Sequence, residues 1–279
     1  MSFHREFVIA LCVYSLLGVL AAAAAAAPGG KDDLDVGGLN IDYMYRPGNE
    51  STVLDKELTQ IALNLEYLEA EYFLWGAYGF GHDVVAPYLV DGGPPPIGAQ
   101  KANLDPYYTD LFIQMGLQEV RISRTLLDVS KMVWAEFMDK AFLTTFGTKL
   151  IPPFDPHADS LKYLVSTYAI PHVGLTGYVG TNPLLFGYNA KMLVAKLLAV
   201  ESSQDAIIRD EMYCQKNLIV VPYRYIVADF SIAISTLRND LSHVFVDEGL
   251  VVPPAMGAES MVSGNVLSVI TSIPTYHLL

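Results

Sequence analysis

Apolar residues recur at alternating steps of four and three along one long stretch, from Leu54 to Trp75. This spacing gathers them on one side of an α-helix and predicts a stripe that faces a helical core. The helix is expected to begin at Ser51 or Thr52, which have the residue type of an N-cap. It is expected to end near Tyr78, where glycines follow.

Comparable apolar patterns predict further helices, whereas signals for β-strands are weak along the whole chain. Asp105 and Pro106 suit the N-cap and first position of a second helix, which is expected to run to about Val129. A third helix begins near residue 160 and is kinked or ended by Pro171. The other expected helical segments are residues 134–142, 189–217 and 225–241. Together these segments predict an all-α fold, followed from residue 244 by an irregular apolar tail.

The start of the chain has the pattern of a secretory signal peptide. An uncharged apolar run from Val8 to Leu20 precedes an alanine tract with cleavage sites near Ala26 or Ala27. An uncleaved membrane anchor is the alternative, because the run is nearly long enough to span a bilayer. We favour the signal peptide, since Pro28 breaks the helix behind it. The expected divisions are a signal peptide at 1–27, a flexible lead-in at 28–50 and a folded domain at 51–279. The protein is then expected in the secretory pathway, and finally in the apoplast or other extracellular space, or in the vacuole.

Composition limits the partners of the protein. Of the 279 residues, 52% are hydrophobic, which is enough to bury a sizeable core. The formal net charge is −13, which argues against binding to nucleic acid or anionic membranes, since both require a basic patch. Once the signal peptide is removed, no stable membrane insertion is expected. Glycine-rich nucleotide loops and the Gly-x-Ser-x-Gly motif are missing, so no nucleotide cofactor or serine-hydrolase chemistry is expected.

Several glutamates lie on apolar helix faces. Glu66 and Glu69 lie on or beside the apolar stripe of the first helix, and Glu119 and Glu201 repeat this pattern on later helices. A carboxylate that faces a bundle interior is costly unless it is paired, protonated or bound to a metal. Glutamates from several helices that point into one bundle are typical of a di-metal carboxylate site.

Four blocks of the chain resemble the plant desiccation-related proteins, a family of the ferritin-like superfamily. The resemblance covers roughly residues 55–268 and implies a four-helix bundle with one long crossover. An extra C-terminal helix and an irregular tail follow the bundle. The four blocks are residues 64–71 (NLEYLEAE), 96–106 (PIGAQKANLDP), 173–180 (VGLTGYVG) and 200–206 (VESSQDA).

The resemblance also implies where a di-metal site would lie. That site uses a glutamate from each of two helices and a Glu-x-x-His from each of the other two. Glu66, Glu119 and Glu201 keep ligand positions, with Glu69 close by. The other three positions are changed, to Ile122 and Gln204 instead of histidine and to Pro171 instead of glutamate. We therefore expect no bound metal or other cofactor, and neither ferroxidase nor oxygenase activity.

Without a metal, Glu66, Glu119 and Glu201 cannot all remain ionised. One or two of them should have a raised pKa unless an arginine, at position 121, 124 or 209, turns inward. A carboxylic acid and a carboxylate in an apolar pocket form an acid–base pair. The three glutamates and His172 are the catalytic candidates. The alternatives are a relic hydrogen-bonded network for the glutamates and a loop hydrogen bond for His172.

Two classes of function remain open. In one, the vacated pocket binds a small apolar plant metabolite and performs metal-free isomerisation or cyclisation. The resemblance extends this class to specialised metabolism, for example a monoterpenoid enol or dialdehyde of the iridoid type. In the other, the protein is a non-catalytic, stress-associated binding or structural protein. Aromatic residues at helical spacing are either pocket wall or simple core. The candidate pocket residues are Glu69, Tyr72, Phe73, Ile122, Tyr168, Tyr178 and Gln204.

Overall fold

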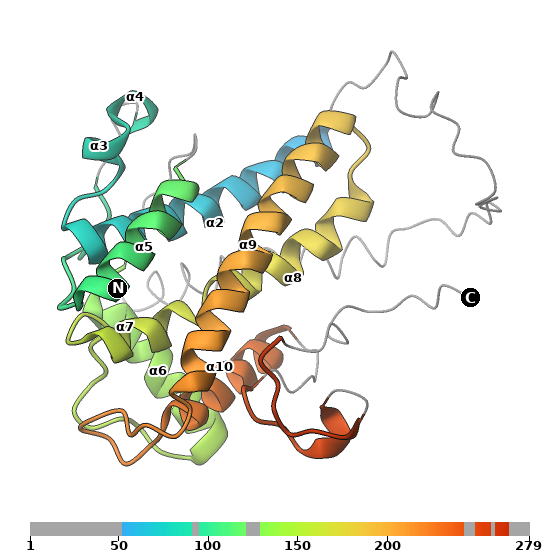
Figure 1. The fold of residues 1–279 in the computed structure, drawn as a ribbon. Coiled ribbons are helices and arrows are strands. Elements are labelled where there is room, and N and C mark those ends of the chain that lie inside the picture. Colours follow the sequence, from blue (N-terminus) through green and yellow to red (C-terminus); the bar gives the residue numbers. More distant parts are fainter. Residues whose placement is uncertain (1–51, 91–94, 121–128, 243–248, 258–259, 268–279) are drawn as a thin grey trace.

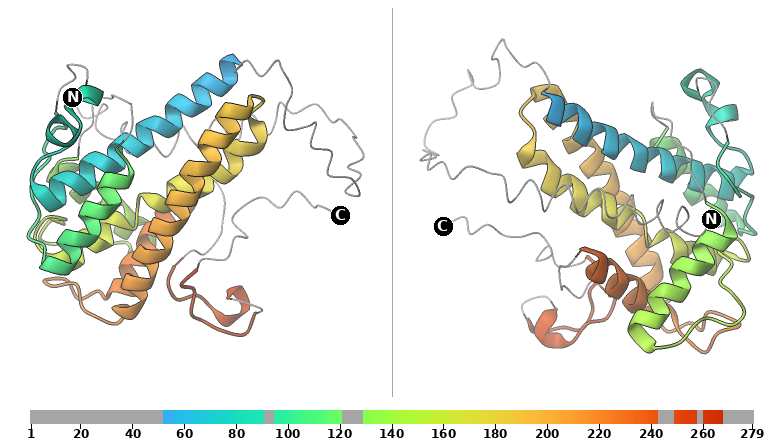
Figure 2. Two further views of the ribbon diagram at one scale, coloured as in Figure 1. Left: turned by 45° about the horizontal axis from the view of Figure 1, so that its top comes forward. Right: turned by 180° about the vertical axis from the view of Figure 1, so that it is seen from behind.

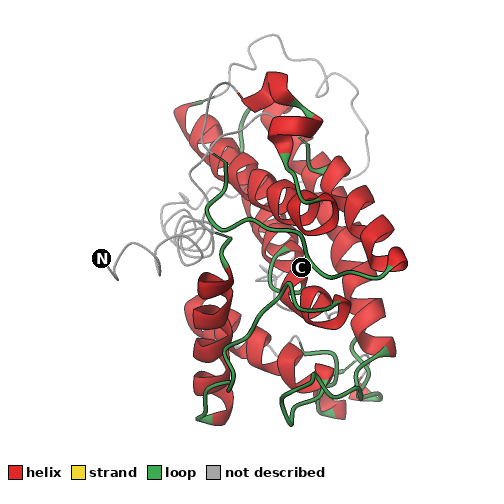
Figure 3. Cartoon of the chain, turned by 90° about the vertical axis from the view of Figure 1, so that its left-hand side faces the viewer, coloured by secondary structure: helices red, strands yellow, loops and turns green. Residues whose placement is uncertain are grey.

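The computed structural model describes residues 52–90, 95–120, 129–242, 249–257 and 260–267. Within these ranges the chain is helical, with isolated β-bridges such as Ile219–Ile226 and Val251–Gly264 and no longer strand (Figure 3). The α-helices are α2 (Val53–Tyr78), α3 (His82–Val85), α4 (Pro87–Val90), α5 (Pro106–Gln118), α6 (Lys131–Phe146), α7 (Ser160–Thr167), α8 (Pro171–Thr181), α9 (Tyr188–Cys214) and α10 (Val227–Ser242). The short 3₁₀ helices are η2 (Asn182–Leu184) and η3 (Pro254–Met256). The predicted signal peptide and lead-in lie outside the described residues.

Local capping fixes both ends of α2. The side chain of Thr52 accepts a hydrogen bond from the backbone N–H of Asp55 at 3.0 Å, and Asp55 accepts one from the N–H of Thr52 at 2.8 Å. This capping box satisfies two backbone donors at the start of the helix. Gly79 ends the helix in the left-handed region, with φ of 88°, where a glycine has no steric penalty. The predicted bounds of this helix are confirmed.

The second helix is shorter than predicted. Asp105 caps α5 as expected, because its side chain accepts a hydrogen bond from the N–H of Tyr108 at 3.0 Å. The helix ends at Gln118, however, and the N–H of Glu119 bonds to the carbonyl of Met115. The prediction of a helix through residue 120 and beyond is therefore wrong at 119–120, and residues 121–128 lie outside the described part. The segment predicted at 134–142 forms the longer helix α6, which a left-handed glycine at 147 ends.

Proline divides the third predicted helix in two. Asp159 caps α7 by accepting a hydrogen bond from the N–H of Lys162 at 2.9 Å, and the helix ends at Thr167. Pro171 then occupies the first position of α8, where its missing N–H would have no helical partner anyway. The predicted interruption of the helix at Pro171 is confirmed, and the proline also starts a new helix, which was not predicted.

The helices form a bundle, and the helices α6 and α10 pack against each other outside it. The helix α2 packs along α5, the helix α8 packs along α9, and α2 also touches both α8 and α9 (Figures 1 and 2). We identify the four members of the bundle as α2, α5, the broken α7–α8 and α9. The helix α10 packs mainly against α6 outside these four. The predicted all-α bundle with an extra C-terminal helix is confirmed.

The C-terminal segment is irregular but anchored. The N–H of Leu250 donates to Ser231 Oγ of α10 at 3.1 Å, and the N–H of Asn265 donates to the carbonyl of Leu250 at 3.0 Å. Leu250 is fully buried, so the segment covers part of the core. Among the described residues, no helix is both long and apolar enough to cross a bilayer.

Candidate functional site

Four glutamates from three helical segments lie in the bundle interior. Glu66 and Glu69 lie on α2, Glu119 follows the last residue of α5, and Glu201 lies on α9. Each of them is 0% exposed, which confirms that they face inward. A spacing of three residues puts Glu66 and Glu69 on the same side of α2. We call these four residues the glutamate cluster.

Two members of the cluster accept hydrogen bonds from neutral side chains. The hydroxyl of Tyr178 on α8 donates to Glu66 Oε1 at 2.8 Å and lies 3.2 Å from the carbonyl of Ala62. The amide Nε2 of Gln204, one turn from Glu201 on α9, donates to Glu119 Oε1. Burial and the surrounding carboxylates raise the pKa of Tyr178, so its hydroxyl keeps its proton. Tyr178 and Gln204 therefore act as donors that orient two carboxyl groups.

The other two members, Glu69 and Glu201, have raised pKa values. Burial raises the pKa of Glu69 well above its usual range, and the charge of Glu66 raises it further. Burial likewise raises the pKa of Glu201, followed by the charges of Glu69, Glu66 and Glu119. No N–H or O–H group of another described residue donates to either carboxyl. The raised pKa values therefore belong to the pair, which binds a proton more readily than an exposed glutamate does. Glu201 is one of the three glutamates among which a raised pKa was expected, whereas Glu69 was not among them.

Glu201 also lies against the backbone of α8. A Cβ atom added at Gly174 would lie 2.4 Å from both Cδ and Oε1 of Glu201. Real side chains do not pack so closely, so the absence of a side chain at this position leaves the room that the carboxyl occupies. Gly174, which belongs to the block of residues 173–180, therefore shapes the glutamate cluster directly.

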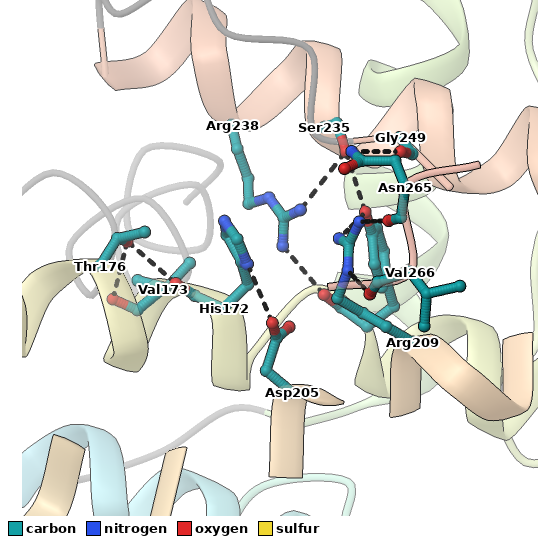
Figure 4. Close-up of polar contacts among 11 residues, drawn as sticks. His172, Val173, Thr176, Asp205, Arg209, Ser235, Arg238, Gly249, Asn265 and Val266 are labelled. Carbon is teal, nitrogen blue, oxygen red and sulfur yellow. Dashed lines mark hydrogen bonds and ion pairs between the residues drawn. The ribbon is translucent and has the colours of Figure 1, made fainter. Parts of the chain in front are cut away.

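A second polar network adjoins the glutamate cluster. His172 in the first turn of α8 lies with Nδ1 3.3 Å from Asp205 Oδ2, and both side chains are buried (Figure 4). Arg209, one turn further along α9, is fully buried and donates to the hydroxyl of Tyr168 at 2.9 Å and to the carbonyl of Val266 at 2.7 Å. The candidate His172 is thus held by a buried carboxylate.

The predicted aromatic wall is dispersed in the core. Tyr72 stacks on Tyr163 with ring centroids 4.9 Å apart, and Phe73 stacks on Phe112 at 5.7 Å. Tyr168 lies between Arg209 and Arg238, whose guanidinium carbons are 5.5 and 4.7 Å from its ring centroid. Contact of these residues with a ligand stays a prediction. Ile122 lies outside the described residues.

One buried pair was missed by the sequence analysis. His82 at the start of α3 directs Nδ1 to Glu71 Oε1 at 3.0 Å, and its backbone N–H donates to the same oxygen at 3.2 Å. The exposed fraction of each residue is 2% or less. Glu71 follows Glu69 by two residues and so lies on a different side of α2. The helical spacing could therefore have indicated that Glu71 has a separate partner. The pair ties the short helix α3 to the bundle.

The donor set does not fit the di-metal centre that the fold implies. At two positions to which the resemblance assigns ligands, the chain has Gln204, whose Nε2 donates to Glu119, and Pro171, the first residue of α8. His172 Nδ1 faces Asp205. No group of three or more His, Cys, Asp or Glu side chains in the described ranges is arranged to hold a metal ion.

An open surface groove of about 500 Å³ between the starts of α5 and α7 contains none of the predicted site residues.

Comparison with known proteins agrees with this bundle. A family model described as Ferritin-like domain matches residues 54–213. The chain belongs to the plant desiccation-related, ferritin-like family. Its ferritin-like domain includes all four glutamates, and the predicted resemblance is confirmed.

Two relatives are similar over most of their length. The chain is 49% identical over 226 residues to "Desiccation-related protein PCC13-62" of Craterostigma plantagineum. It is 48% identical over 226 residues to "Ferritin-like catalase Nec2" of Nesocodon mauritianus. Each match covers 77% of this chain and 71% of the relative. No solved structure matches the ferritin-like chain significantly.

Proposed function

We propose that the glutamate cluster is a metal-independent acid–base site for a small apolar plant metabolite. The observation that carries this proposal is the buried pair of Glu69 and Glu201, which retains a proton above the usual pKa of a glutamate. An acid whose pKa is raised by burial can donate a proton near neutral pH. Perturbed pKa values gather at functional sites, because catalytic acids and bases need pKa values matched to their task.

The charge of the cluster restricts its substrate class. Four carboxyl groups repel phosphates and carboxylates, so a diphosphate substrate is unsuited to this site. The buried guanidinium of Arg209 binds the Tyr168 hydroxyl and a backbone carbonyl. A neutral carbonyl compound fits better, since its oxygen accepts a hydrogen bond from a carboxylic acid. We propose isomerisation or cyclisation of such a compound, for example a monoterpenoid enol or dialdehyde of the iridoid type.

The proposed chemistry moves protons and leaves oxidation states unchanged. Glu201 donates its proton to the carbonyl oxygen, which makes the adjacent carbon atoms reactive. A carboxylate then removes a proton from carbon, and Glu66 is placed for this because the Tyr178 hydroxyl orients its Oε1. One proton enters the substrate and one leaves it. A proton shift between the glutamates restores the starting state.

We propose that this chemistry takes place in the secretory pathway, with the mature protein in the apoplast or vacuole. The apolar run and alanine tract before residue 28 support this proposal. Transient expression of the full-length chain with a C-terminal fluorescent tag tests it. Fluorescence in the cytosol alone would contradict the proposed route.

Proton exchange tests the enzymatic proposal directly. The purified protein, treated with a chelator and checked for metals, is incubated in D₂O with monoterpenoid dialdehydes, and products are followed by mass spectrometry and NMR. We expect a cyclised or isomerised product that carries deuterium. Glu201→Gln should lower turnover by about 100-fold or more, as expected for loss of a general acid. Glu136→Gln makes the same change at an exposed position and should be neutral. Turnover that requires an added metal would overturn the metal-independent proposal.

A non-catalytic role in desiccation is the second candidate. The 49% identity to a desiccation-related protein favours it, as do the hydrogen bonds that Tyr178 and Gln204 already make to the cluster. Absence of both turnover and binding across the metabolite panel would favour this role. A catalase activity, named for one relative, is a third candidate. We rank it last because an amide and a proline occupy two ligand positions, and an assay with added manganese or iron tests it.

A further inference from the structure

The starts of α2 and α9 meet at one end of the bundle (Figure 2). A single buried side chain joins them. Asp55 Oδ2 accepts hydrogen bonds from the backbone N–H of Thr52 at 2.8 Å and from that of Gly187 at 3.1 Å. Asp55 Oδ1 accepts the N–H of Phe186 at 2.8 Å. The residue at which the chain enters α2 therefore lies beside the residues that precede α9.

Three large apolar side chains are exposed at this end of the bundle. The exposed fraction is 70% for Phe186, 44% for Tyr188 and 40% for Met192. Tyr188 and Met192 are four residues apart and so lie on the same side of α9, and Phe186 precedes Tyr188 by two residues. We call these three residues the end patch. Exposed apolar side chains that lie together are typical of a surface that another group covers.

A glycosylation sequence directly precedes the start of α2. Asn49-Glu50-Ser51 is the one Asn-x-Ser/Thr sequence in the chain, and such a sequence accepts an N-linked glycan in a secreted protein. Asn49 lies outside the described residues, but the chain itself limits its position. Three residues span at most about 11 Å, so Asn49 is held within that distance of Thr52 and hence close to the end patch.

We propose that Asn49 carries an N-linked glycan whose first sugars pack on the end patch. This inference rests on the secretory route proposed above. In the transfer, the amide nitrogen of Asn49 bonds to C1 of the first sugar of a lipid-diphosphate-linked oligosaccharide. The lipid diphosphate leaves, and the amide loses one proton. The C–H groups on the face of a sugar ring then pack on the negative face of the Phe186 or Tyr188 ring. A bulky glycan at this place also hinders a second copy of the chain from binding to the end patch.

Expression in plant cells tests the modification. The full-length chain is compared with a version in which a foreign signal peptide replaces residues 1–27. We expect peptide N-glycosidase A to lower the apparent mass of the protein. Asn49→Gln and Ser51→Ala should abolish this shift, whereas Ser51→Thr should keep it. Asn189→Gln is the matched control, because Asn189 is exposed near the end patch but is not followed by a serine or threonine two residues later. No shift in the version with the foreign signal peptide, once that version is secreted, would overturn the proposal. A shift in that version alone would refute the native route and still assign the site.

Removal of the glycan from the folded protein tests where it packs. A dye that fluoresces on exposed apolar surface, such as ANS, is added before and after the enzyme treatment. We expect its fluorescence to rise in the wild type and to stay unchanged in Phe186→Ser. Val221→Ser is the control, because Val221 is 68% exposed but lies beyond the other end of α9, about 40 Å away, and this variant should keep the rise. Equal fluorescence before and after treatment would overturn the contact with the end patch. A dimer of the glycosylated protein that Phe186→Ser disrupts would also overturn it.

Discussion

Two charged regions share the inner face of α9, and they differ in how their charges are compensated. At Glu201, burial and the charges of three neighbouring carboxyl groups raise the pKa. At Arg209, eight residues or about 12 Å along the same helix, the charge is bound by carbonyl and hydroxyl oxygens. Burial alone therefore does not distinguish a functional charge from a structural one, because both side chains are fully buried.

The two regions should affect the stability of the fold in opposite directions. A buried ion with complementary partners is costly to disrupt, whereas a buried cluster of like charges costs stability and is kept for another reason. The region around Arg209 should therefore behave as an anchor, and the glutamate cluster as a site. The mutations below should separate these two behaviours.

The largest expected effect comes from Arg209→Met. The change removes the hydrogen bonds to Tyr168 and to the C-terminal segment, and it leaves Asp205 with one cation fewer. Loss of one partner from a buried charged network costs about 3–5 kcal/mol. For a domain of this size, the melting temperature should fall by roughly 10 °C. Arg224→Met is the matched control, because Arg224 is solvent-exposed. The melting temperature of this variant should equal that of the wild type. A fall below 2 °C for Arg209→Met would mean that this region is no anchor.

The pH dependence of stability should have opposite signs in the two regions. Glu201 binds a proton in the folded state above the pKa of an unfolded glutamate. The free energy of unfolding should therefore fall as pH rises from about 4.5 towards the raised pKa, by up to about 1.4 kcal/mol per unit. The contribution of Asp205, whose pKa is lowered, should be lost only as pH falls below its usual range near 3.8. Urea unfolding at several pH values measures both trends.

Substitution isolates the contribution of the glutamate cluster to this pH dependence. Glu201→Gln should flatten the decrease above pH 4.5, whereas Glu136→Gln, on the surface of α6, should leave the curve unchanged. An unchanged slope in Glu201→Gln would show that Glu201 does not have the raised pKa.

A smaller effect is expected from Gly174→Ala. The added methyl group collides with the Glu201 carboxyl at 2.4 Å, and overpacking of this kind typically costs about 1–3 kcal/mol. Gly116→Ala is the matched control, because its methyl group would meet the apolar Leu74 at 2.9 Å instead. Both variants should lose stability, but only Gly174→Ala should also alter the pH dependence described above. An identical pH dependence in the two variants would show that Gly174 acts through packing alone.

The sequence predicted those structural features that depend only on residues close together in the chain. Helix starts were expected at Ser51 or Thr52, at Asp105 and near residue 160. The caps are Thr52, Asp105 and Asp159, and each accepts a hydrogen bond from a backbone N–H three residues later. The inward orientation of the glutamates followed from their place on apolar helix faces. These features are local, so the pattern of a few turns is enough to predict them.

The contacts that complete the site could not be predicted in this way. His172 meets Asp205 from 33 residues away, and Arg209 reaches the C-terminal segment across 56 or more residues. Nothing in the local pattern distinguishes Asp205 from an exposed aspartate of a polar helix face. The early end of α5 was missed because the apolar pattern continues past Gln118 although the helix does not. Such features depend on how the helices meet.

The anchor of Arg209 also bears on how the protein can be divided. The ferritin-like match ends at residue 213, which invites the production of a shorter fragment that stops there. Such a fragment would retain Arg209 but lose Val266 and the whole of α10, exposing a buried guanidinium and the core of Ile208 and Met212. The end of the family match is therefore not a boundary of autonomous folding. A soluble minimal protein should extend at least to residue 267.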